Sequence, residues 1–371
     1  PNDRSPDRRL KIGYVSPDFR EHVVGHNVLP IIRDHDRSQF EIFCYSNVRA
    51  PDEMTDRFKE LADQWRPIYR IPDEEVAKKI REDQIDILVD LALHMSYGRL
   101  LVFARMPAPV QATFAGYPGG TGLDAIGYRL SDPYLDPPEM TQTYQVERCV
   151  RLPDTFWCYD PEGMETHKAP PIAPLPAEKN GFITFGCFNN FCKINDGVLD
   201  LWGRVLAAVP KSRLTILCQR GPQRQWVLDR LAGQKVAADR VEFVERTNRV
   251  RYLTFYSRID IGLDTFPYNG HTTSLDSLWM GVPVVTLVGQ TPVARAGFSQ
   301  LCNLDLRQLA ASNQQEFVSI AAALAADLPR LAELRRNLRP RMLQSPLCDA
   351  VKFTRNIEAA YRRMWQEWVS R

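Results

Sequence analysis

The residues with the clearest chemical meaning lie in one segment, LDTFPYNGHTTSLDSLWMGVP, in which an apolar run gives way at Asp264 to a turn and then to a helical pattern. A strand that leads through a turn into a helix presents free backbone N–H groups and the positive end of the helix dipole, and anions bind there. His271, Thr272 and Thr273 at the helix start add side-chain donors for phosphate oxygens. Asp276, one turn further along, could receive a ribose hydroxyl. The segment predicts a nucleotide diphosphate site, although a threonine that only caps a helix would give the same local pattern.

A second candidate site follows another apolar run, in the segment GCFNNFCKI. Lys193 stands just before a helical pattern, where its ammonium group can reach a diphosphate as a point charge, and Asn190 can bridge a phosphate or sugar oxygen. Further along, backbone groups near Thr247 could read the edge of a nucleobase on which Tyr252 stacks. A solvated lysine and a helix that packs its aromatic residues into the core are the plain alternatives. Two strand–turn–helix sites in one half of the chain favour the nucleotide interpretation.

Histidines mark candidate sites in the first half of the chain. His22 and His26 follow the first apolar run in the segment SPDFREHVVGH, and His22 could act as a general base or as a donor to an acceptor hydroxyl. A histidine pair at this spacing is more often structural or solvated. His94 follows another apolar run, and the glycine-rich segment PAPVQATFAGYPGGTG allows the backbone to approach a ligand closely, unless it is only a turn between elements.

No metal-binding or cofactor motif is present in the sequence. The six histidines form no cluster with the cysteines, and Asp34-His35-Asp36 follows a helical pattern, which indicates a polar loop and not a metal site. Walker A, Gly-x-Gly-x-x-Gly and Gly-x-Ser-x-Gly sequences are missing, so kinase-like, dehydrogenase-like and hydrolase-like functions lose their main support.

The candidate residues must be positioned by short strands that alternate with helices. This alternation occurs once in each half and predicts two parallel sheets with crossover helices. The expected strands are Lys11–Val15, Phe40–Tyr45, Ile85–Leu91, Val110–Phe114, Phe182–Phe188, Arg213–Cys218, Val241–Val244, Ile259–Leu263 and Val282–Leu287. The expected helices include Met54–Trp65, Glu74–Arg81, Val198–Ala208, Gln223–Ala232 and Phe353–Val369.

A proline-rich stretch without periodicity, KAPPIAPLPAEKN, predicts the boundary between two domains. We expect an N-terminal Rossmann-like domain over 1–167, a linker over 168–180 and a C-terminal Rossmann-like domain over 181–345. The last segment, 346–371, is expected to close back on the N-terminal domain as an amphipathic helix whose aromatic stripe is a packing face. Ligands in such folds bind at the carboxyl ends of the strands, and we expect the two sheets to face one cleft.

The bulk composition is that of a soluble globular protein. The 371 residues are 44% hydrophobic and 25% charged with a net charge of +2, so neither a nucleic acid partner nor a membrane is indicated. The eight scattered cysteines form no Cys-x-x-Cys pair, which indicates free thiols in a reducing cytoplasm.

Taken together, these motifs resemble the catalytic region of the O-linked N-acetylglucosamine transferases, a family that includes bacterial homologues and the plant SPINDLY proteins. The resemblance runs from about Leu10 to Trp368, and the order and spacing of the motifs match as well. The matching segments are GYVSPDFREH (13–22), EDQIDILVDL (82–91), PAPVQATFAGYPGGTGL (107–123), FGCFNNFCKI (185–194), LDTFPYNGHTTSLDSLWMGVPVVTL (263–287) and SPLCD (345–349).

The resemblance implies a fold of the glycosyltransferase B type and an inverting, metal-independent transfer of a sugar from a nucleotide donor to Ser or Thr hydroxyls of proteins. It implies catalytic roles for His22 and Lys193, with no metal and no cofactor besides the donor. The donor-binding residues that it implies are Asn190, Thr247, Arg249, Tyr252, Tyr268, His271, Thr272, Thr273 and Asp276. The acceptor-side residues that it implies are His94, Tyr117, Pro118 and Gly119.

The helix start separates two donors within this family. SPINDLY-type fucosyltransferases usually carry a run of threonines followed by Cys-Glu, whereas this chain has His271 and Asp276, which favours UDP-GlcNAc over GDP-fucose. Protein O-fucosylation remains the alternative. A sugar-nucleotide-binding scaffold without turnover is a third possibility, because Leu93-His94-Met95 stands where the family often has Gly-His-Thr. The family's tetratricopeptide repeats, which precede the catalytic region and recruit protein acceptors, are not in this sequence; they were either trimmed away or never existed.

Overall fold

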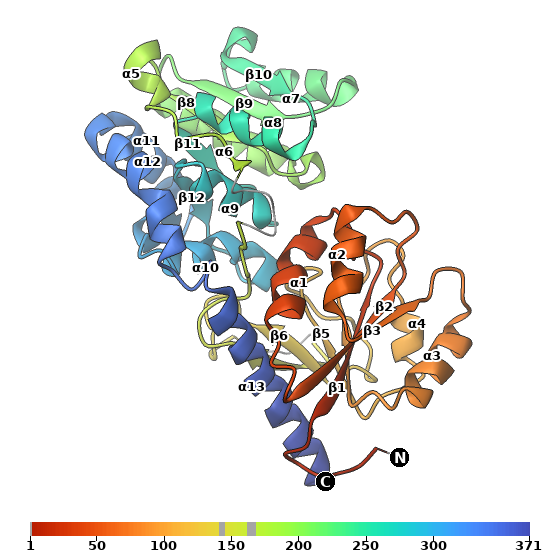
Figure 1. The fold of residues 1–371 in the computed structure, drawn as a ribbon. Helices are drawn as coiled ribbons and strands as arrows, with labels where there is room; N and C mark the ends of the chain where they lie inside the picture. The colour runs from red at the N-terminus through yellow and green to blue at the C-terminus, as the bar shows by residue number, and fades with distance from the viewer. Residues whose placement is uncertain (1, 141–144, 162–167) are drawn as a thin grey trace. The chain divides into compact units, whose positions relative to one another are not determined.

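A computed structural model describes residues 2–140, 145–161 and 168–371 of the chain (Figure 1). The chain divides into two units, one formed by Pro1–Met164 with Pro346–Arg371 and the other by Glu165–Ser345. The predicted end of the first domain, residue 167, lies outside the described residues.

The first unit is built on a parallel sheet of seven strands in the order β3-β2-β1-β4-β5-β6-β7. Its central strands are buried along their length, as expected of a parallel sheet covered on both faces. The register places Ile12 opposite Ile42 on one side and Ile87 on the other. The strands are β1 (Leu10–Ser16), β2 (Phe40–Ser46), β3 (Gln64–Pro67), β4 (Ile87–Asp90), β5 (Val110–Thr113), β6 (Tyr128–Ser131) and β7 (Arg148–Arg151).

Five helices cover this sheet: α1 (Val23–Asp34), α2 (Glu53–Leu61), α3 (Asp73–Glu82), α4 (Leu100–Phe103) and α13 (Ala350–Val369). Helix α1 packs against α2 and α13, and α3 packs against α4 (Figure 1). The apolar stripe of α13 is buried at Phe353, Ile357, Tyr361, Met364 and Trp365, so the aromatic residues of this helix are a packing face, as predicted.

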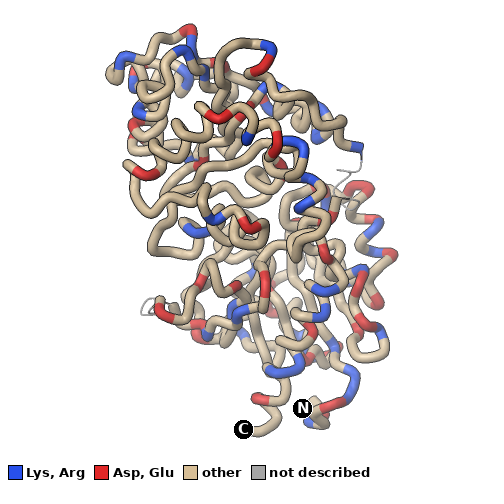
Figure 2. The backbone as a smooth tube through the Cα atoms, turned by 90° about the vertical axis from the view of Figure 1, so that its left-hand side faces the viewer, with Lys and Arg blue, Asp and Glu red and all other residues tan. Residues whose placement is uncertain are grey.

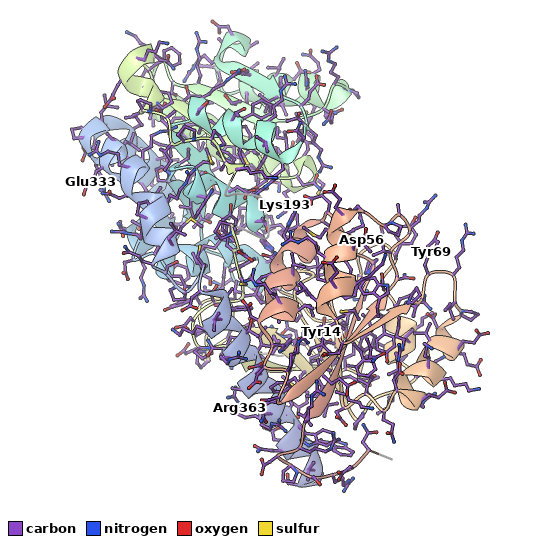
Figure 3. The ribbon with its side chains drawn as sticks, viewed as in Figure 1. Tyr14, Asp56, Tyr69, Lys193, Glu333 and Arg363 are labelled. Atoms are coloured by element: carbon purple, nitrogen blue, oxygen red, sulfur yellow. The ribbon has the colours of Figure 1, made fainter. Side chains whose placement is uncertain are left out.

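A buried hydrogen-bond chain also ties α13 to the sheet. Tyr14 of β1, labelled in Figure 3, lies with its hydroxyl oxygen 2.8 Å from Nε2 of His35, and the Nδ1 atom of His35 lies 3.0 Å from Glu358 of α13. His35 is thus a buried core histidine. In the described part of the chain, no three His, Cys, Asp or Glu side chains are grouped as a metal ion would need.

The second unit is built on a parallel sheet of six strands in the order β10-β9-β8-β11-β12-β13. The strands are β8 (Thr184–Cys187), β9 (Arg213–Leu217), β10 (Val241–Val244), β11 (Ile261–Leu263), β12 (Val284–Leu287) and β13 (Ala310–Ala311). The helices are α5 (Pro176–Asn180), α6 (Asp196–Ala208), α7 (Pro222–Ala232), α8 (Arg249–Thr254), α9 (Thr272–Trp279), α10 (Ala296–Cys302), α11 (Gln314–Ala326) and α12 (Leu328–Leu343). In both sheets the chain starts at a central strand, moves to one edge, returns and then moves to the other, which is the doubly wound Rossmann order.

The predicted fold class, two Rossmann-like parallel α/β domains, is therefore confirmed. The helix predicted over Met54–Trp65 ends at Leu61, because Trp65 belongs to the edge strand β3 and pairs with Cys44. The predicted linker also contains structure: its last residues form α5, whose Ala177 N–H donates to the buried carboxylate of Asp260 in the second unit.

Charges of both signs are interspersed along the two units (Figure 2), in keeping with the small net charge. None of the helices in the described part of the chain combines the length and apolarity that a bilayer crossing requires. All eight cysteines are free thiols; six are buried, Cys192 is exposed and Cys348 is intermediate.

Candidate active site

The predicted anion site lies at the start of α9, which follows β11 and the Asn-Gly turn. The N-cap residue is His271, whose side chain makes no capping hydrogen bond, and the two threonines are the first residues inside the helix. The alternative that a threonine caps the helix is therefore wrong. The Oγ1 atom of Thr272 is buried without a hydrogen-bond partner among the described residues, and Thr273 Oγ1 donates to Asn189 Oδ1.

The turn before α9 is held by the buried carboxylate of Asp264. Its Oδ1 atom accepts hydrogen bonds from the backbone N–H groups of Gly270 (2.6 Å) and Thr265 (2.8 Å). Burial raises the pKa of Asp264, and these donors oppose that rise. A Cβ atom at Gly270 would lie 2.1 Å from Ser274 Oγ, so only glycine fits this close approach. The start of α9 is thus fixed from beneath by a polar cluster.

Asn189 belongs to this cluster and was missed by the sequence analysis. Its side-chain N–H group donates to Asp264 Oδ1 (3.2 Å) and to Thr265 Oγ1 (2.8 Å), and its oxygen accepts from Thr273. The predicted neighbour, Asn190, is instead exposed and caps the short helix Phe191–Lys193 through the Cys192 N–H. Sequence alone does not separate two adjacent asparagines after a strand; the first of the pair lies closer to the buried strand end.

Lys193 lies beside the same turn (Figure 3). Its Nζ donates to the backbone oxygen of Asn269 at 2.7 Å and lies 3.8 Å from the centroid of the Tyr268 ring. Burial lowers the pKa of Lys193 to about 8, and the charge of Asp264 opposes this shift. The structure therefore brings Lys193, Tyr268 and the residues at the start of α9 together around one turn. The Tyr268 and His271 rings are also neighbours, with centroids 5.3 Å apart.

The predicted base and ribose residues lie around α8. Arg249 donates from both Nη atoms to the two oxygens of Asp276, which is 1% exposed. Because Arg249 donates to both oxygens of this buried carboxylate, Asp276 positions the guanidinium group. A ribose hydroxyl could bind Asp276 only if it shared or replaced one of these two hydrogen bonds. Thr247 lies partly buried in the loop between β10 and α8.

Tyr252 of α8 lies in an aromatic cluster. Its ring is edge-on to that of Tyr256 (centroids 5.5 Å apart), and the two hydroxyl oxygens are 2.7 Å apart. Tyr256 in turn donates to the backbone oxygen of Thr273 at 3.0 Å. Tyr252 therefore packs, half-buried, in an aromatic cluster and is linked to the start of α9 at the same time, so both interpretations of this aromatic residue stay open.

In the first unit, His22 lines a cavity of about 650 Å³ beyond the carboxyl ends of the strands. His22 is the N-cap of α1: its Nδ1 accepts from the Val24 N–H at 3.2 Å and lies 3.4 Å from Asp18 Oδ2. Burial lowers the pKa of His22, and the charge of Asp18 opposes this shift. His26 is buried and paired with Glu21, which is the structural role that the sequence analysis favoured.

His94 lines the same cavity, with its Nε2 donating to the backbone oxygen of Thr121 at 2.9 Å. Tyr117, Pro118 and Gly119 do not line it. A Cβ atom at Gly119 would lie 2.7 Å from the Tyr117 ring, so packing within the loop accounts for that glycine. Of the four predicted acceptor-side residues, only His94 is brought to the cavity by the structure.

Comparisons with known proteins show the family to which the chain belongs. The sequence profile of glycosyl transferase family 41 matches residues 1–172 and 175–357. The chain is 44% identical, over 99% of its length, to the probable UDP-N-acetylglucosamine–peptide N-acetylglucosaminyltransferase SPINDLY of Oryza sativa subsp. japonica, and 30% identical, over 96%, to the corresponding SEC protein of Arabidopsis thaliana. It spans 40% and 37% of those relatives, respectively.

Among solved structures, a mutant of the Thermobaculum terrenum O-GlcNAc transferase matches all of this chain with a TM-score of 0.92 and 41% identity, and 70% of that chain is covered. The Anabaena protein HepE, solved with UDP and glucose, matches 95% of the chain at a TM-score of 0.59 and 11% identity, a similarity that supports the fold alone.

Proposed function

The chain belongs to glycosyl transferase family 41, and from this membership we propose that it transfers N-acetylglucosamine from UDP-GlcNAc to Ser and Thr hydroxyls of proteins. The observation that carries the proposal is the meeting of Lys193 with the start of α9: the lysine Nζ lies 2.7 Å from the backbone oxygen of Asn269, at the turn that leads into the helix. An ammonium group beside a helix N-terminus is a donor set for a diphosphate leaving group.

The proposed donor site acts on the charge that develops as UDP leaves. Lys193 and the first N–H groups of α9 would neutralise the diphosphate, so that no metal ion is needed. Burial holds the pKa of Lys193 at about 8 in the free protein, and a bound diphosphate would raise it again because an anion favours the charged ammonium. The hydroxyl of Thr272, which is buried without a partner among the described residues, is a further donor for a phosphate oxygen.

The proposed acceptor site is the His22 cavity. In an inverting transfer the serine or threonine oxygen bonds to the anomeric carbon from the face opposite to UDP, and the bond from that carbon to the phosphate oxygen breaks. The hydroxyl proton passes to His22, to another base or to a donor phosphate oxygen. At the helix cap, Nδ1 accepts from the Val24 N–H, so the neutral ring there carries its proton on Nε2. For His22 to accept a proton at Nε2, the ring must take the other tautomer, in which the Nδ1–H gives up the cap and faces Asp18 Oδ2, 3.4 Å away. We therefore assign Asp18 as a positioning residue for the imidazole.

The identity of the transferred sugar is tested by incubating the chain with UDP-GlcNAc or with GDP-fucose, in separate reactions, and a Ser/Thr peptide library. We expect N-acetylhexosamine on the peptides. Fucose without N-acetylhexosamine would establish the SPINDLY-type alternative, and UDP binding with neither transfer nor donor hydrolysis would establish the scaffold.

The finer parts of the proposal have their own tests. Transfer is expected to survive removal of divalent ions by a chelator, and the anomeric configuration of the product, read by NMR, is expected to be opposite to that of the donor. We also propose a cytoplasmic location and protein acceptors that are recruited by repeats upstream of this chain.

A further inference from the structure

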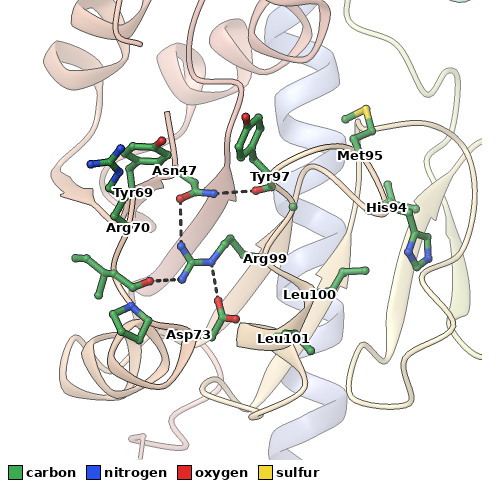
Figure 4. Close-up of a pocket in the computed structure, with 14 residues that line it drawn as sticks. Asn47, Tyr69, Arg70, Asp73, His94, Met95, Tyr97, Arg99, Leu100 and Leu101 are labelled. Carbon is green, nitrogen blue, oxygen red and sulfur yellow. Dashed lines mark hydrogen bonds and ion pairs between the residues drawn. The ribbon is translucent and has the colours of Figure 1, made fainter. Parts of the chain in front are cut away.

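A second cavity in the first unit, of about 590 Å³, adjoins the one that contains His22 (Figure 4). The two share four lining residues: Asn47, His94, Met95 and Tyr97. They therefore form one continuous depression, whose outer part is reached from His22 by way of Tyr97. We call this outer part, lined by Tyr69–Asp73, Leu93 and Gly98–Leu101 besides the shared residues, the flank groove.

The floor of the flank groove is held by a single guanidinium group. Arg99 donates to Asp73 Oδ1 (2.7 Å), to Asn47 Oδ1 (3.1 Å) and to the backbone oxygen of Ile71 (2.7 Å), and Asn47 donates onward to the backbone oxygen of Tyr97 at 2.8 Å (Figure 4). These bonds join the ends of β2 and β3, the start of α3 and the loop after β4. The groove is thus formed by a connected polar network and is present before any ligand binds.

Backbone strain is concentrated at the same place. Of the nine non-glycine residues with positive φ in the described part of the chain, three line the flank groove: Arg70 (65°), Leu93 (47°) and Tyr97 (64°). Such conformations cost on the order of 1–3 kcal/mol each and cluster at ligand sites. The strain turns Arg70 and Tyr97 outward, and both side chains are exposed.

The charges that line the whole depression do not cancel. Each carboxylate is engaged by an arginine: Asp73 accepts from Arg99, and Asp18 accepts from Arg20. Two further arginines, Arg49 and Arg70, line the two parts of the depression and have no ion pair among the described residues; Arg49 Nη1 donates only to the Tyr97 hydroxyl (3.3 Å).

The remaining wall is apolar and open to solvent. Tyr97 is 54% exposed and Leu101 is 63% exposed, and the Arg70 guanidinium lies 5.4 Å from the Tyr69 ring. Large exposed apolar side chains beside unpaired cations fit a polypeptide better than a small anion, because they can cover its side chains while the cations meet its carboxylates.

We propose that the flank groove binds the acceptor polypeptide beside the modified hydroxyl, and that Arg49 and Arg70 select acidic side chains in that flank. The inference rests on the proposed function, since it takes the His22 cavity as the place of the acceptor hydroxyl. Continuity with that cavity, the preformed floor and the two unpaired cations support an extended, acidic segment over a neutral or basic one.

The test uses one Ser-containing peptide and its variants, in which a single Glu, Gln or Lys is placed at successive positions on either side of the serine. Binding to the 371-residue chain is measured by fluorescence anisotropy, and transfer from UDP-GlcNAc is measured as kcat/KM. At one or more positions on one side we expect Glu to exceed Gln by about two- to fivefold and Lys to be weakest, because an exposed ion pair contributes up to about a factor of five. The preference should shrink as salt is added.

Charge-reversal variants test which residues cause the preference for acidic peptides. Arg49→Glu with Arg70→Glu is expected to reverse the order, so that Lys exceeds Glu. Arg363→Glu with Arg371→Glu, which makes the same total charge change at two exposed arginines of the C-terminal segment, is the matched control and should keep the wild-type order. An unchanged order in the double variant, or no discrimination between Glu and Gln in binding, would overturn the inference. Because binding is read without the donor, charge-dependent binding with no transfer would overturn the proposed function and leave the binding site for acidic peptides standing.

Discussion

At the scale of single residues, the proposed site for the sugar nucleotide depends on the buried carboxylate of Asp264, which accepts hydrogen bonds from four neighbouring residues. Asp264 accepts from Gly270, Thr265, Asn189 and Thr286, and through them it sets the start of α9. Burying a charged carboxylate costs free energy, which hydrogen bonds to its oxygens offset. Each of these four partners therefore contributes to the stability of the turn.

Replacing Asn189 by Asp is expected to lower the free energy of unfolding by about 3–5 kcal/mol, because it puts a second carboxylate at hydrogen-bond distance from Asp264. Asn190→Asp, one residue away and exposed, should change it by less than about 0.5 kcal/mol. Chemical denaturation of both variants measures this difference. Equal losses would show that the cluster around Asp264 does not distinguish the two asparagines.

We expect Lys193 to lower the free energy of unfolding of the chain when no nucleotide is bound. Its pKa of about 8 lies below the ordinary lysine value of 10.5, so the unfolded chain binds more protons between these values and the stability contribution of Lys193 rises with pH across that window. Lys193→Met should therefore raise the free energy of unfolding by about 1–3 kcal/mol at pH 7, with the gain shrinking toward pH 10. The same variant should lose stabilisation by UDP and most of its transfer activity.

Thermal denaturation with and without UDP, across pH, separates these effects, with Lys179→Met as an exposed control in the same unit. A Lys193→Met variant that is still stabilised by UDP as strongly as the wild type would contradict the phosphate assignment.

His22 has two separable roles, as a helix cap and as a candidate base. Because its pKa is lowered from 6.5, kcat/KM should fall only as the pH drops below that value, where the ring becomes protonated. His22→Asn keeps a capping side chain for α1 and should lose about 100-fold or more in kcat with little loss of stability, whereas His22→Ala should lose both. Asp18→Asn should lower kcat by favouring the wrong ring tautomer. Full activity in His22→Asn would remove the imidazole as the base.

At the scale of elements, both sites lie where a strand passes into a helix, and this much was predictable. The apolar runs located β1, β2, β4, β5, β8, β9, β10, β11 and β12 to within two residues, and the turn chemistry located the start of α9. Strands β3, β6 and β7 were missed because they are short and carry polar or arginine side chains, so that no apolar run marks them. The Arg249–Asp276 pair, the Asn189 cluster and the Arg99 network were not predictable, because their members are brought together from distant parts of the chain.

The terminal helix α13 is the element whose contribution is easiest to measure. Trp365 is fully buried and its Nε1 donates to the backbone oxygen of Ser5 at 3.1 Å, so Trp365→Ala should lower the free energy of unfolding of the first unit by about 3–5 kcal/mol. Arg363→Ala, on the exposed side of the same helix, should change it by less than about 0.5 kcal/mol. Calorimetry of the two variants compares them. A small effect at Trp365 would mean that α13 does not belong to the core of the unit.

At the scale of the whole molecule, the chain consists of two units with the same doubly wound strand order, and each places its candidate residues beyond the carboxyl ends of its strands. The second unit carries Lys193 and the start of α9, and the first carries His22 and the flank groove. This division matches the two halves of the proposed reaction, one for the donor and one for the acceptor.

The most direct test of the proposed reaction offers UDP-GlcNAc and GDP-fucose together, at equal concentration, with one Ser-containing peptide, and reads the peptide mass. The account predicts addition of N-acetylhexosamine by the wild type, none by Lys193→Met, and transfer in full by Lys179→Met. Addition of fucose alone, or N-acetylhexosamine transfer that is as fast in Lys193→Met as in the wild type, would contradict it.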